Sequence, residues 1–231
     1  MIFAANFKTN HTRKTTRAYM QRLEKLAQSI DNPIYIFPPL TALERFDSSR
    51  LVIGTQNAYP TQNGAFTGEV GLEQLGEFDI ETILIGHSER REFLGESQET
   101  IAKKFDFFKT QGFTIIYCIG EPLEVRQAGE EALKAYLFAQ LEGIDLEYAK
   151  LIVAYEPIWA IGTGVSASKE DIRSTHALLG RVIKAPLLYG GSVKTANIKE
   201  IASIEEVDGV LVGSASLDAD GFFEMIQTSK D

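Results

Sequence analysis

The most constraining feature of this sequence is a series of short apolar segments that alternate with helical patterns along the whole chain. The segments are rich in β-branched residues and almost continuously apolar, as strands buried on both faces are. There are eight of them, at residues 2–5, 34–37, 51–56, 82–85, 114–118, 151–155, 187–189 and 209–212. We expect each to form a β-strand.

Amphipathic helical patterns separate most of these strands. Residues 16–30, for example, place Tyr19, Leu23 and Leu26 on one face and charged residues on the other. Ser97 is the expected N-cap of the helix at 97–111, which ends before Gly112. Further helices are expected at 130–141, 168–183 and 218–227, with shorter ones at 40–46 and 195–201.

Strict alternation of strand and helix predicts parallel pairing through right-handed crossovers. Eight units favour a closed (β/α)₈ barrel with outer helices, in the α/β class, over an open doubly wound sheet, although counting alone does not distinguish them. No low-complexity segment or linker rich in Pro, Gly or Ser interrupts the pattern. Residues 1–231 are therefore expected to form a single domain.

Composition excludes several classes of partner. The formal charge is −9, with 23 basic and 32 acidic residues, which argues against binding to nucleic acid or to an anionic membrane. No apolar run is long enough to span a bilayer, and residues 1–5 do not form a signal peptide. Because Cys118 is the only cysteine, an intramolecular disulfide is impossible. We expect a cytoplasmic location.

Polar residues follow several strands where a barrel would hold its active site, at the carboxyl ends. Asn6 and Lys8 follow the first strand, His87 the fourth and Glu156 the sixth. His87 precedes an expected short helix, whose N-terminus would favour a neutral imidazole. A lone lysine or glutamate at a strand end is usually a solvated surface charge, so the argument depends on their combination.

Two arginines follow His87 in the sequence Gly86-His87-Ser88-Glu89-Arg90-Arg91. Both could have a purely structural role. We expect Arg90 and Arg91 to form ion pairs with nearby carboxylates.

The segment after Glu156 is apolar, contains the only tryptophan and has no charge until Lys169. An exposed loop gains no solubility from such a composition, whereas a lid that excludes water over a ligand requires it. Glycine-bearing turns also follow the last two strands, Tyr189-Gly190-Gly191-Ser192 and Gly213-Ser214-Ala215-Ser216. Turns at these two places are typical of phosphate sites in such barrels.

Together these groups define a reaction class. A carboxylate base, a neutral hydrogen-bond donor, a lysine and a phosphate site suit removal of a proton next to a carbonyl group. The base would take a carbon-bound proton and return it one carbon away. This chemistry requires neither a metal nor an organic cofactor.

The motifs resemble those of the triosephosphate isomerase family over essentially the whole chain, which implies the TIM-barrel fold. The matching stretches are 5–8, 56–58, 64–69, 86–91, 155–164 and 189–192, of which 86–91 and 155–164 are highly specific. The resemblance implies interconversion of D-glyceraldehyde 3-phosphate and dihydroxyacetone phosphate in glycolysis and gluconeogenesis.

The resemblance also implies roles for individual residues. Glu156 would be the base, His87 the electrophile, and Lys8 and Asn6 would contact the intermediate and the phosphate. Glu89 would support these groups without touching substrate, and Ser88 would line the site. The remaining positions would form two groups. The backbone amides of Gly162, Ser192, Gly213 and Ser214 would bind the phosphate. Ile161 and Leu211 would form an apolar clamp around the base.

The sequence departs from the family pattern at a few places. Phe7 stands where tryptophan is usual, and Ser214 replaces a glycine of the last phosphate loop. The lid ends in Val165-Ser166-Ala167 without the usual lysine, and the helix before the seventh strand is expected to be shortened. None of these changes removes a catalytic group.

A homodimer is a further implication of the resemblance. Residues 57–68 have no helical or strand pattern, and a loop this long is uncommon in a compact domain unless it is functional. From the residues alone, docking of this loop on a partner subunit and packing of the loop against its own barrel are almost equally well supported. In the family the matching loop inserts beside the partner's first loop, so Thr67 is expected to reach the partner's active site.

Other functions remain possible at this point. A different phosphate-binding barrel is one, although no expected strand carries a Schiff-base lysine for an aldolase, and His87 and Glu156 are too few ligands for a metal-dependent epimerase. A catalytically inactive barrel kept for binding is another, against which the intact Asn6, Lys8, His87 and Glu156 argue.

Overall fold

The computed structural model describes residues 1–161 and 166–230. It confirms all eight expected strands, and every pair of neighbouring strands is parallel. The strands are β1 (Ile2–Asn6), β2 (Ile34–Phe37), β3 (Leu51–Ile53), β4 (Thr82–Ile85), β5 (Thr114–Ile119), β6 (Leu151–Tyr155), β7 (Leu187–Tyr189) and β8 (Gly209–Val212).

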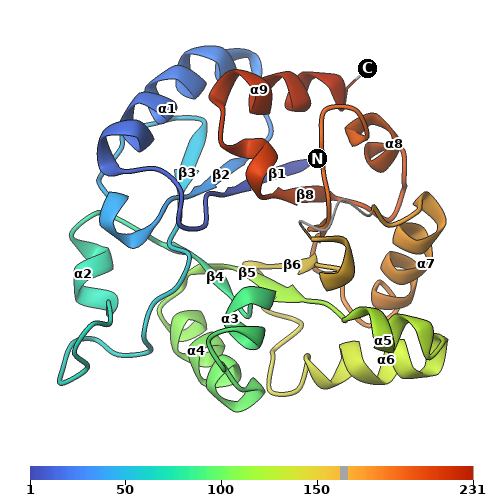
Figure 1. Ribbon diagram of the computed structural model, residues 1–231. Helices are drawn as coiled ribbons and strands as arrows, with labels where there is room; N and C mark the ends of the chain where they lie inside the picture. Colours follow the sequence, from blue (N-terminus) through green and yellow to red (C-terminus); the bar gives the residue numbers. More distant parts are fainter. Residues whose placement is uncertain (162–165, 231) are drawn as a thin grey trace.

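The strands form a nearly closed barrel. Their order is β3-β2-β1-β8-β7-β6-β5-β4, so the first and last strands of the chain are neighbours (Figure 1). The two edge strands meet through Thr55, which forms a bridge with Ile83 and whose N–H donates to the Thr82 carbonyl at 2.9 Å. Strand β3 ends earlier than expected because its continuation contributes only this bridge. The prediction of a (β/α)₈ barrel is confirmed.

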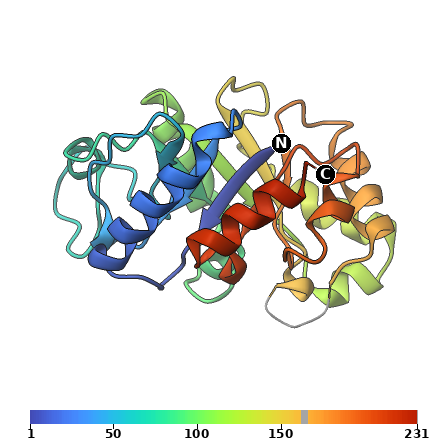
Figure 2. The same cartoon turned by 90° about the horizontal axis from the view of Figure 1, so that it is seen from above.

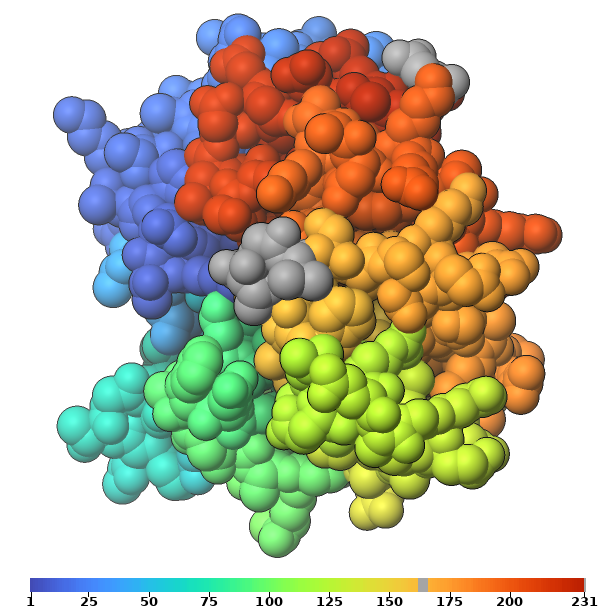
Figure 3. Space-filling view, turned by 45° about the vertical axis from the view of Figure 1, so that its right-hand side comes forward, coloured from blue at the N-terminus to red at the C-terminus, as the bar shows by residue number. Residues whose placement is uncertain are grey.

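Helices surround the sheet. The longer ones are α1 (Arg13–Leu26), α4 (Gln98–Thr110), α6 (Glu130–Ala139), α7 (Lys169–Leu179) and α9 (Ala219–Thr228). Short helices are α2 (Leu72–Gly76), α3 (Ser88–Glu92), α5 (Leu123–Gln127) and α8 (Ile198–Ala202), and 3₁₀ turns lie at Ala27–Ser29, Leu40–Ala42, Ile158–Ala160 and Ser214–Ser216. Helices α1 and α9 pack side by side, so an early and a late segment of the chain are neighbours (Figures 2 and 3).

The core has two parts, because each strand buries side chains on both faces. One part fills the barrel interior, and the other lies between the strands and the helices. The buried residues of the interior, apart from Phe37, are small or branched, and the partly buried Ile2 and Tyr35 pack against them. The buried residues are Ala4, Phe37, Leu84, Ile116, Cys118, Ile152, Ala154, Leu188 and Leu211. This filled interior confines the polar side chains at the strand ends to the barrel mouth.

Several helix predictions need correction at their ends, and one is wrong. Ser97 does cap α4, since its hydroxyl accepts the N–H of Thr100 at 3.2 Å. Residues 40–46 form only a 3₁₀ turn, and Leu43 is extended and buried. A segment this short gains little from helical hydrogen bonds, so burial of Leu43 determines its conformation. Within the described residues, no helix has the length and apolar character needed to cross a membrane.

Candidate active site

A cavity of about 650 Å³ opens at the carboxyl ends of the strands. Residues from the loops after β1, β4, β6, β7 and β8 line it. The lining residues are Asn6, Lys8, Asn10, His87, Glu156, Ile161, Gly190, Gly191, Ser192, Val193, Lys194, Leu211, Gly213, Ser214 and Ala215. All the residues assigned to catalysis, phosphate binding or the clamp are brought together here, except Gly162, which lies outside the described residues.

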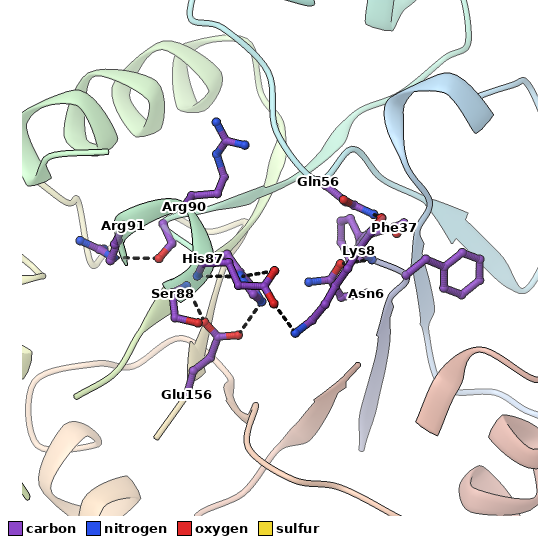
Figure 4. Close-up of polar contacts among 12 residues, drawn as sticks. Asn6, Lys8, Phe37, Gln56, His87, Ser88, Arg90, Arg91 and Glu156 are labelled. Atoms are coloured by element: carbon purple, nitrogen blue, oxygen red, sulfur yellow. Dashed lines mark hydrogen bonds and ion pairs between the residues drawn. The ribbon is translucent and has the colours of Figure 1, made fainter. Parts of the chain in front are cut away.

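Glu156 and His87 form the centre of this cavity. The His87 Nε2 atom lies 3.1 Å from the Glu156 Oε1 atom, and the other carboxylate oxygen accepts the N–H of Ser88 at 3.1 Å (Figure 4). Both side chains are buried, with residue exposures of 2% for Glu156 and 6% for His87. The hydrogen bonds hold the carboxylate in one orientation toward the barrel axis.

The hydrogen bonds of His87 define its tautomer. Its Nδ1 atom accepts the N–H of Glu89 at 3.3 Å, at the first turn of α3. A nitrogen that accepts this bond carries no proton, so the ring proton is on Nε2 and points to Glu156. Burial disfavours the imidazolium, but the adjacent Glu156 carboxylate outweighs it and raises the His87 pKa while no ligand separates the two groups.

The charge of Glu156 is determined by opposing effects. Burial alone would raise its pKa, but the His87 imidazole and the Ser88 N–H lower it below the usual value. The carboxylate is therefore ionised at neutral pH. An ionised, buried carboxylate beside a cavity is a competent base.

Lys8 enters the cavity from the side opposite Glu156 (Figure 4). Its Nζ atom forms a 2.6 Å ion pair with Glu89, and its backbone has a positive φ of 52°. The Asn6 side chain accepts the Lys8 N–H at 3.0 Å, and the Gln56 amide donates to the Lys8 carbonyl at 2.8 Å. These two bonds hold Lys8 in a backbone conformation that non-glycine residues seldom adopt.

The two glycine turns lie on the far wall of the cavity. Ser192, Gly213 and Ser214 all line it, and the Asn197 amide fixes the first turn by donating to the Ser192 carbonyl at 2.9 Å. A side-chain carbon on Gly190 would lie 2.8 Å from the Glu156 Cγ atom. Glycine is therefore required for this turn to approach Glu156 so closely.

Some lining or supporting residues were missed from the sequence. Lys194 and Asn10 line the cavity, and Gln56 supports Lys8 from the loop after β3. The position of Lys194, two residues after Ser192, could have indicated it. Another is Glu121, which is fully buried and accepts hydrogen bonds from the Trp159 indole and the Tyr155 hydroxyl, both at 2.9 Å. Glu121 thereby anchors the start of the expected lid.

The two arginines after His87 behave differently from each other. Arg90 forms the expected ion pair, with Glu96 at 2.6 Å. The prediction for Arg91 is wrong: its guanidinium donates to the Gly86 carbonyl, to Gln98 and to the Tyr117 hydroxyl. Neutral acceptors therefore replace the carboxylate that we expected beside Arg91.

Comparison with known proteins agrees with this geometry. The family model described as triosephosphate isomerase matches residues 1–229. A triosephosphate isomerase from Sulfurovum sp. (strain NBC37-1) is 64% identical over 228 residues, which cover 98% of this chain and 99% of that protein.

Other relatives carry the same name. Those from Wolinella succinogenes and Helicobacter pylori (strain Shi470) are 61% and 50% identical, and the matches cover 98% and 97% of this chain and 99% and 97% of the relatives. These names decide between the phosphate-binding barrel enzymes considered above. The chain is an isomerase and belongs to the triosephosphate isomerase family.

Proposed function

We propose that this isomerase converts D-glyceraldehyde 3-phosphate to dihydroxyacetone phosphate, and back, through an enediolate, with Glu156 as the base. The observation that carries these roles is the 3.1 Å contact between two buried groups, Glu156 and His87, in a cavity that also contains the glycine turns. A substrate whose phosphate lies at those turns extends its carbonyl end toward this pair.

Glu156 removes the proton from the carbon next to the aldehyde, and the electron pair of that C–H bond forms the double bond of the enediolate. Negative charge then develops on the former carbonyl oxygen. The proton of the hydroxyl group on the neighbouring carbon passes to the former carbonyl oxygen. The protonated Glu156 then returns its own proton to the former aldehyde carbon, which yields the ketone with its hydroxymethyl group and restores the carboxylate. Atoms and charge balance without a cofactor or metal.

His87 stabilises the developing oxyanion by donating its Nε2–H. A substrate oxygen beside His87 takes the place of the Glu156 carboxylate as its acceptor. Triosephosphate isomerases are standard examples of enzymes that use a neutral imidazole in this way. Lys8 adds positive charge, and the Asn6 amide donates nearby.

The phosphate is held by backbone N–H groups of Ser192, Gly213 and Ser214, with Gly162 contributing from the lid. Ile161 and Leu211, which line the cavity, form the apolar clamp. Their role is to exclude water, because a hydrated enediolate phosphate can lose its phosphate group.

The test is a coupled assay of dihydroxyacetone phosphate formed from D-glyceraldehyde 3-phosphate. We expect turnover by the wild-type protein, a severe loss in Glu156→Gln, and no loss in the control Glu124→Gln, which changes an exposed glutamate on α5. Folded wild-type protein that produces no dihydroxyacetone phosphate would refute the proposed reaction.

We further propose a homodimer in which Thr67 enters the active-site region of the partner. The loop that carries Thr67 protrudes from the barrel, at the lower left of Figure 1, and exposes 42% of Phe66. Beside the catalytic cavity, a hollow of about 420 Å³ is lined by Asn6, Lys8, Gln56, Glu89 and their neighbours. Two exposed apolar residues at its rim, Phe93 and Leu94, suit contact with a partner.

Dimerisation is tested by Thr67→Arg, with sedimentation and activity measured across a dilution series. We expect a monomer whose activity is reduced, because Lys8 loses the support of the partner. Thr110→Arg adds the same charge on α4 and serves as the control. A fully active Thr67→Arg monomer would exclude this interface.

We also infer that residues 1–231 form one domain that acts in the cytoplasm. All eight strands share one sheet, and Cys118 is buried with a free thiol, as is usual in a reducing compartment. Limited proteolysis that releases a stable fragment, or fractionation that places the protein outside the cytoplasm, would contradict these inferences.

A further inference from the structure

The turn before His87 is supported from outside the barrel. Gly86 has a positive φ of 79°, and the Arg91 Nε atom donates to its carbonyl at 2.8 Å. A side-chain carbon on Gly86 would lie 2.8 Å from the Arg91 Nη2 atom. The guanidinium therefore packs directly on the turn that orients His87.

Neutral groups hold Arg91 in place. Its Nη1 atom donates to the Gln98 side-chain oxygen at 2.8 Å, and its Nη2 atom donates to the Tyr117 hydroxyl at 3.1 Å. The Gln98 amide in turn donates to the Tyr117 hydroxyl at 3.1 Å and to the carbonyls of Gln140 and Glu142. Among the residues described, no carboxylate pairs with Arg91.

The Tyr117 hydroxyl also connects to a second turn, at Gly120, which lies against Glu156. The fully buried Tyr117 donates to the Gln140 carbonyl at the end of α6. The Gln140 side chain then bonds both backbone groups of Gly120, at 2.8 and 3.1 Å. A side-chain carbon on Gly120 would lie only 1.7 Å from the Glu156 carbonyl oxygen, so these two backbones are in direct contact.

Tyr117 thus connects the supports of both reacting groups. Its oxygen accepts two hydrogen bonds and donates one, which uses the full capacity of a phenol. We name Arg91, Gln98, Tyr117 and Gln140 the hydrogen-bonded frame. It touches the turn before His87 on one side and the turn against Glu156 on the other.

We propose that Tyr117 is a positioning residue for the isomerisation, and that the frame sets the spacing between His87 and Glu156. The inference rests on the roles proposed above for these two residues. It follows from the contacts because the frame adds a side-chain connection between the two turns to the backbone pairing of β4, β5 and β6. Misplacement of reacting groups by about 1 Å can cost on the order of 100-fold in rate.

The informative variant is Tyr117→Phe, which keeps the ring and removes the hydroxyl. It leaves Arg91 and Gln98 without an acceptor and the Gln140 carbonyl without this donor. We expect kcat to fall about 10-fold, a fraction of the loss for full misplacement. KM should change little, because the hydrogen bonds of the frame within the described part of the chain do not involve the turns after β7 and β8 that are proposed to hold the phosphate.

A pH profile provides a second measurement. When the spacing loosens, Glu156 loses part of the contacts with His87 and Ser88 that lower its pKa. The acidic limb of the kcat/KM profile, which reports groups of the free enzyme, should therefore move to higher pH in Tyr117→Phe.

Tyr148→Phe is the matched control. The Tyr148 hydroxyl donates to the Phe113 carbonyl at 2.8 Å, at the opposite end of β5 from the active site. This variant also loses one hydrogen bond to a carbonyl, so its Tm should fall, while kcat and the pH profile stay unchanged. Equal effects of both variants on Tm, with kcat unchanged in both, would overturn the proposal.

Gln140→Leu tests the second half of the frame. It should lower kcat as Tyr117→Phe does, and the double variant should lose less than the product of the two single losses, because both interrupt one connection. Independent, multiplicative losses would contradict a shared frame.

NMR titration of the His87 imidazole separates failure of the frame from failure of the proposed function, because it does not require turnover. We expect Tyr117→Phe, but not Tyr148→Phe, to shift the His87 titration midpoint. A His87 titration that is identical in both variants and the wild type would overturn the proposal even if the enzyme reaction proved to be different.

Discussion

At the scale of single residues, the geometry around Glu156 determines how strongly the reaction rate should depend on the length of this side chain. The carboxylate is fixed by the His87 imidazole and the Ser88 N–H, and the Gly190 turn packs against its side chain. A shorter acid at this position keeps its charge but cannot maintain the same reach.

We predict that Glu156→Asp lowers kcat on the order of 100-fold, because the carboxylate is withdrawn by one methylene from the carbon it deprotonates. KM should change far less, since the phosphate turns are intact. Steady-state kinetics in the coupled assay provide the measurement. Nearly full turnover in this variant would show that Glu156 is not the base.

Position along the chain predicted some residues of the site well and others poorly. Asn6 ends β1, and His87 and Glu156 follow β4 and β6 within two residues. The ends of parallel strands meet at one mouth of the barrel. Besides the Gly86 carbonyl, the acceptors of Arg91 lie on helix α4 and strand β5. Such contacts depend on tertiary packing, which is why a carboxylate partner was wrongly expected.

At the scale of elements, a buried ion pair joins α3, α4 and the segment between them. Glu96 lies between Arg90 and Lys104, and the Lys104 ammonium also donates to the Asn57 side chain at 2.7 Å. Partial burial disfavours the charge of Glu96, but the hydrogen bonds from Arg90 and Lys104 outweigh it and lower the pKa below the usual 4.5.

We predict that this pair stabilises the fold above about pH 4.5, the value Glu96 has when unfolded, and that the stabilisation is lost as pH falls through the lower folded pKa. Glu96→Gln should cost on the order of 3 kcal/mol at pH 7, because it leaves Lys104 buried without its counter-charge. The difference from wild type should shrink in acid.

The measurement is urea denaturation at fixed protein concentration across this pH range. Glu99→Gln is the control, because Glu99 pairs with Lys103 on the solvent-exposed side of the same helix. Should Glu96→Gln cost no more than Glu99→Gln at pH 7, the account of this ion pair is wrong.

Helices and strands could be predicted from the sequence when they were long enough to show a hydrophobic pattern. The strands were found from near-continuous apolar runs, and α1 and α4 from their amphipathic faces. The short helices α2 and α5 were missed because one turn contains too few residues to reveal a period. At residues 40–46 a helix was wrongly predicted, because the spacing of the apolar residues is that of a helix. In the structure Leu43 is buried in an extended conformation.

At the scale of the whole molecule, an acidic protein must attract a doubly charged anion. The formal charge is −9, and Lys8 at the cavity is already paired with Glu89. Lys194 also lines the cavity and is exposed, and it forms no ion pair within 1–161 and 166–230. Its charge is therefore available to approaching substrate.

We predict that Lys194→Gln lowers kcat/KM about two- to five-fold at low ionic strength, with kcat unchanged. Triosephosphate isomerases are standard examples of enzymes at the diffusional ceiling, where attraction of substrate limits the rate. The effect should disappear as salt is added. Lys199→Gln, on α8 outside the cavity, is the control. A loss that persists at high salt would indicate a direct contact instead of long-range attraction.

The alternating pattern favoured barrel closure without deciding it, because an open doubly wound sheet has the same alternation of strands and helices. Eight strand-helix units leave few ways to cover both faces of a parallel sheet. The narrow junction between β3 and β4, formed by the single bridge at Thr55, was not predicted. Only residues 51–53 are apolar, and the expected strand wrongly included Gly54, Thr55 and Gln56.

The central claim is that a carboxylate moves a proton between adjacent carbons. It is tested most directly by ¹H NMR of dihydroxyacetone phosphate made from D-glyceraldehyde 3-phosphate by the wild-type protein in D₂O. We predict deuterium on the hydroxymethyl carbon, because a proton held on Glu156 can exchange with solvent before it is returned. Product that retains all of the substrate hydrogen would contradict the account, since it would indicate a hydride shift that needs no base.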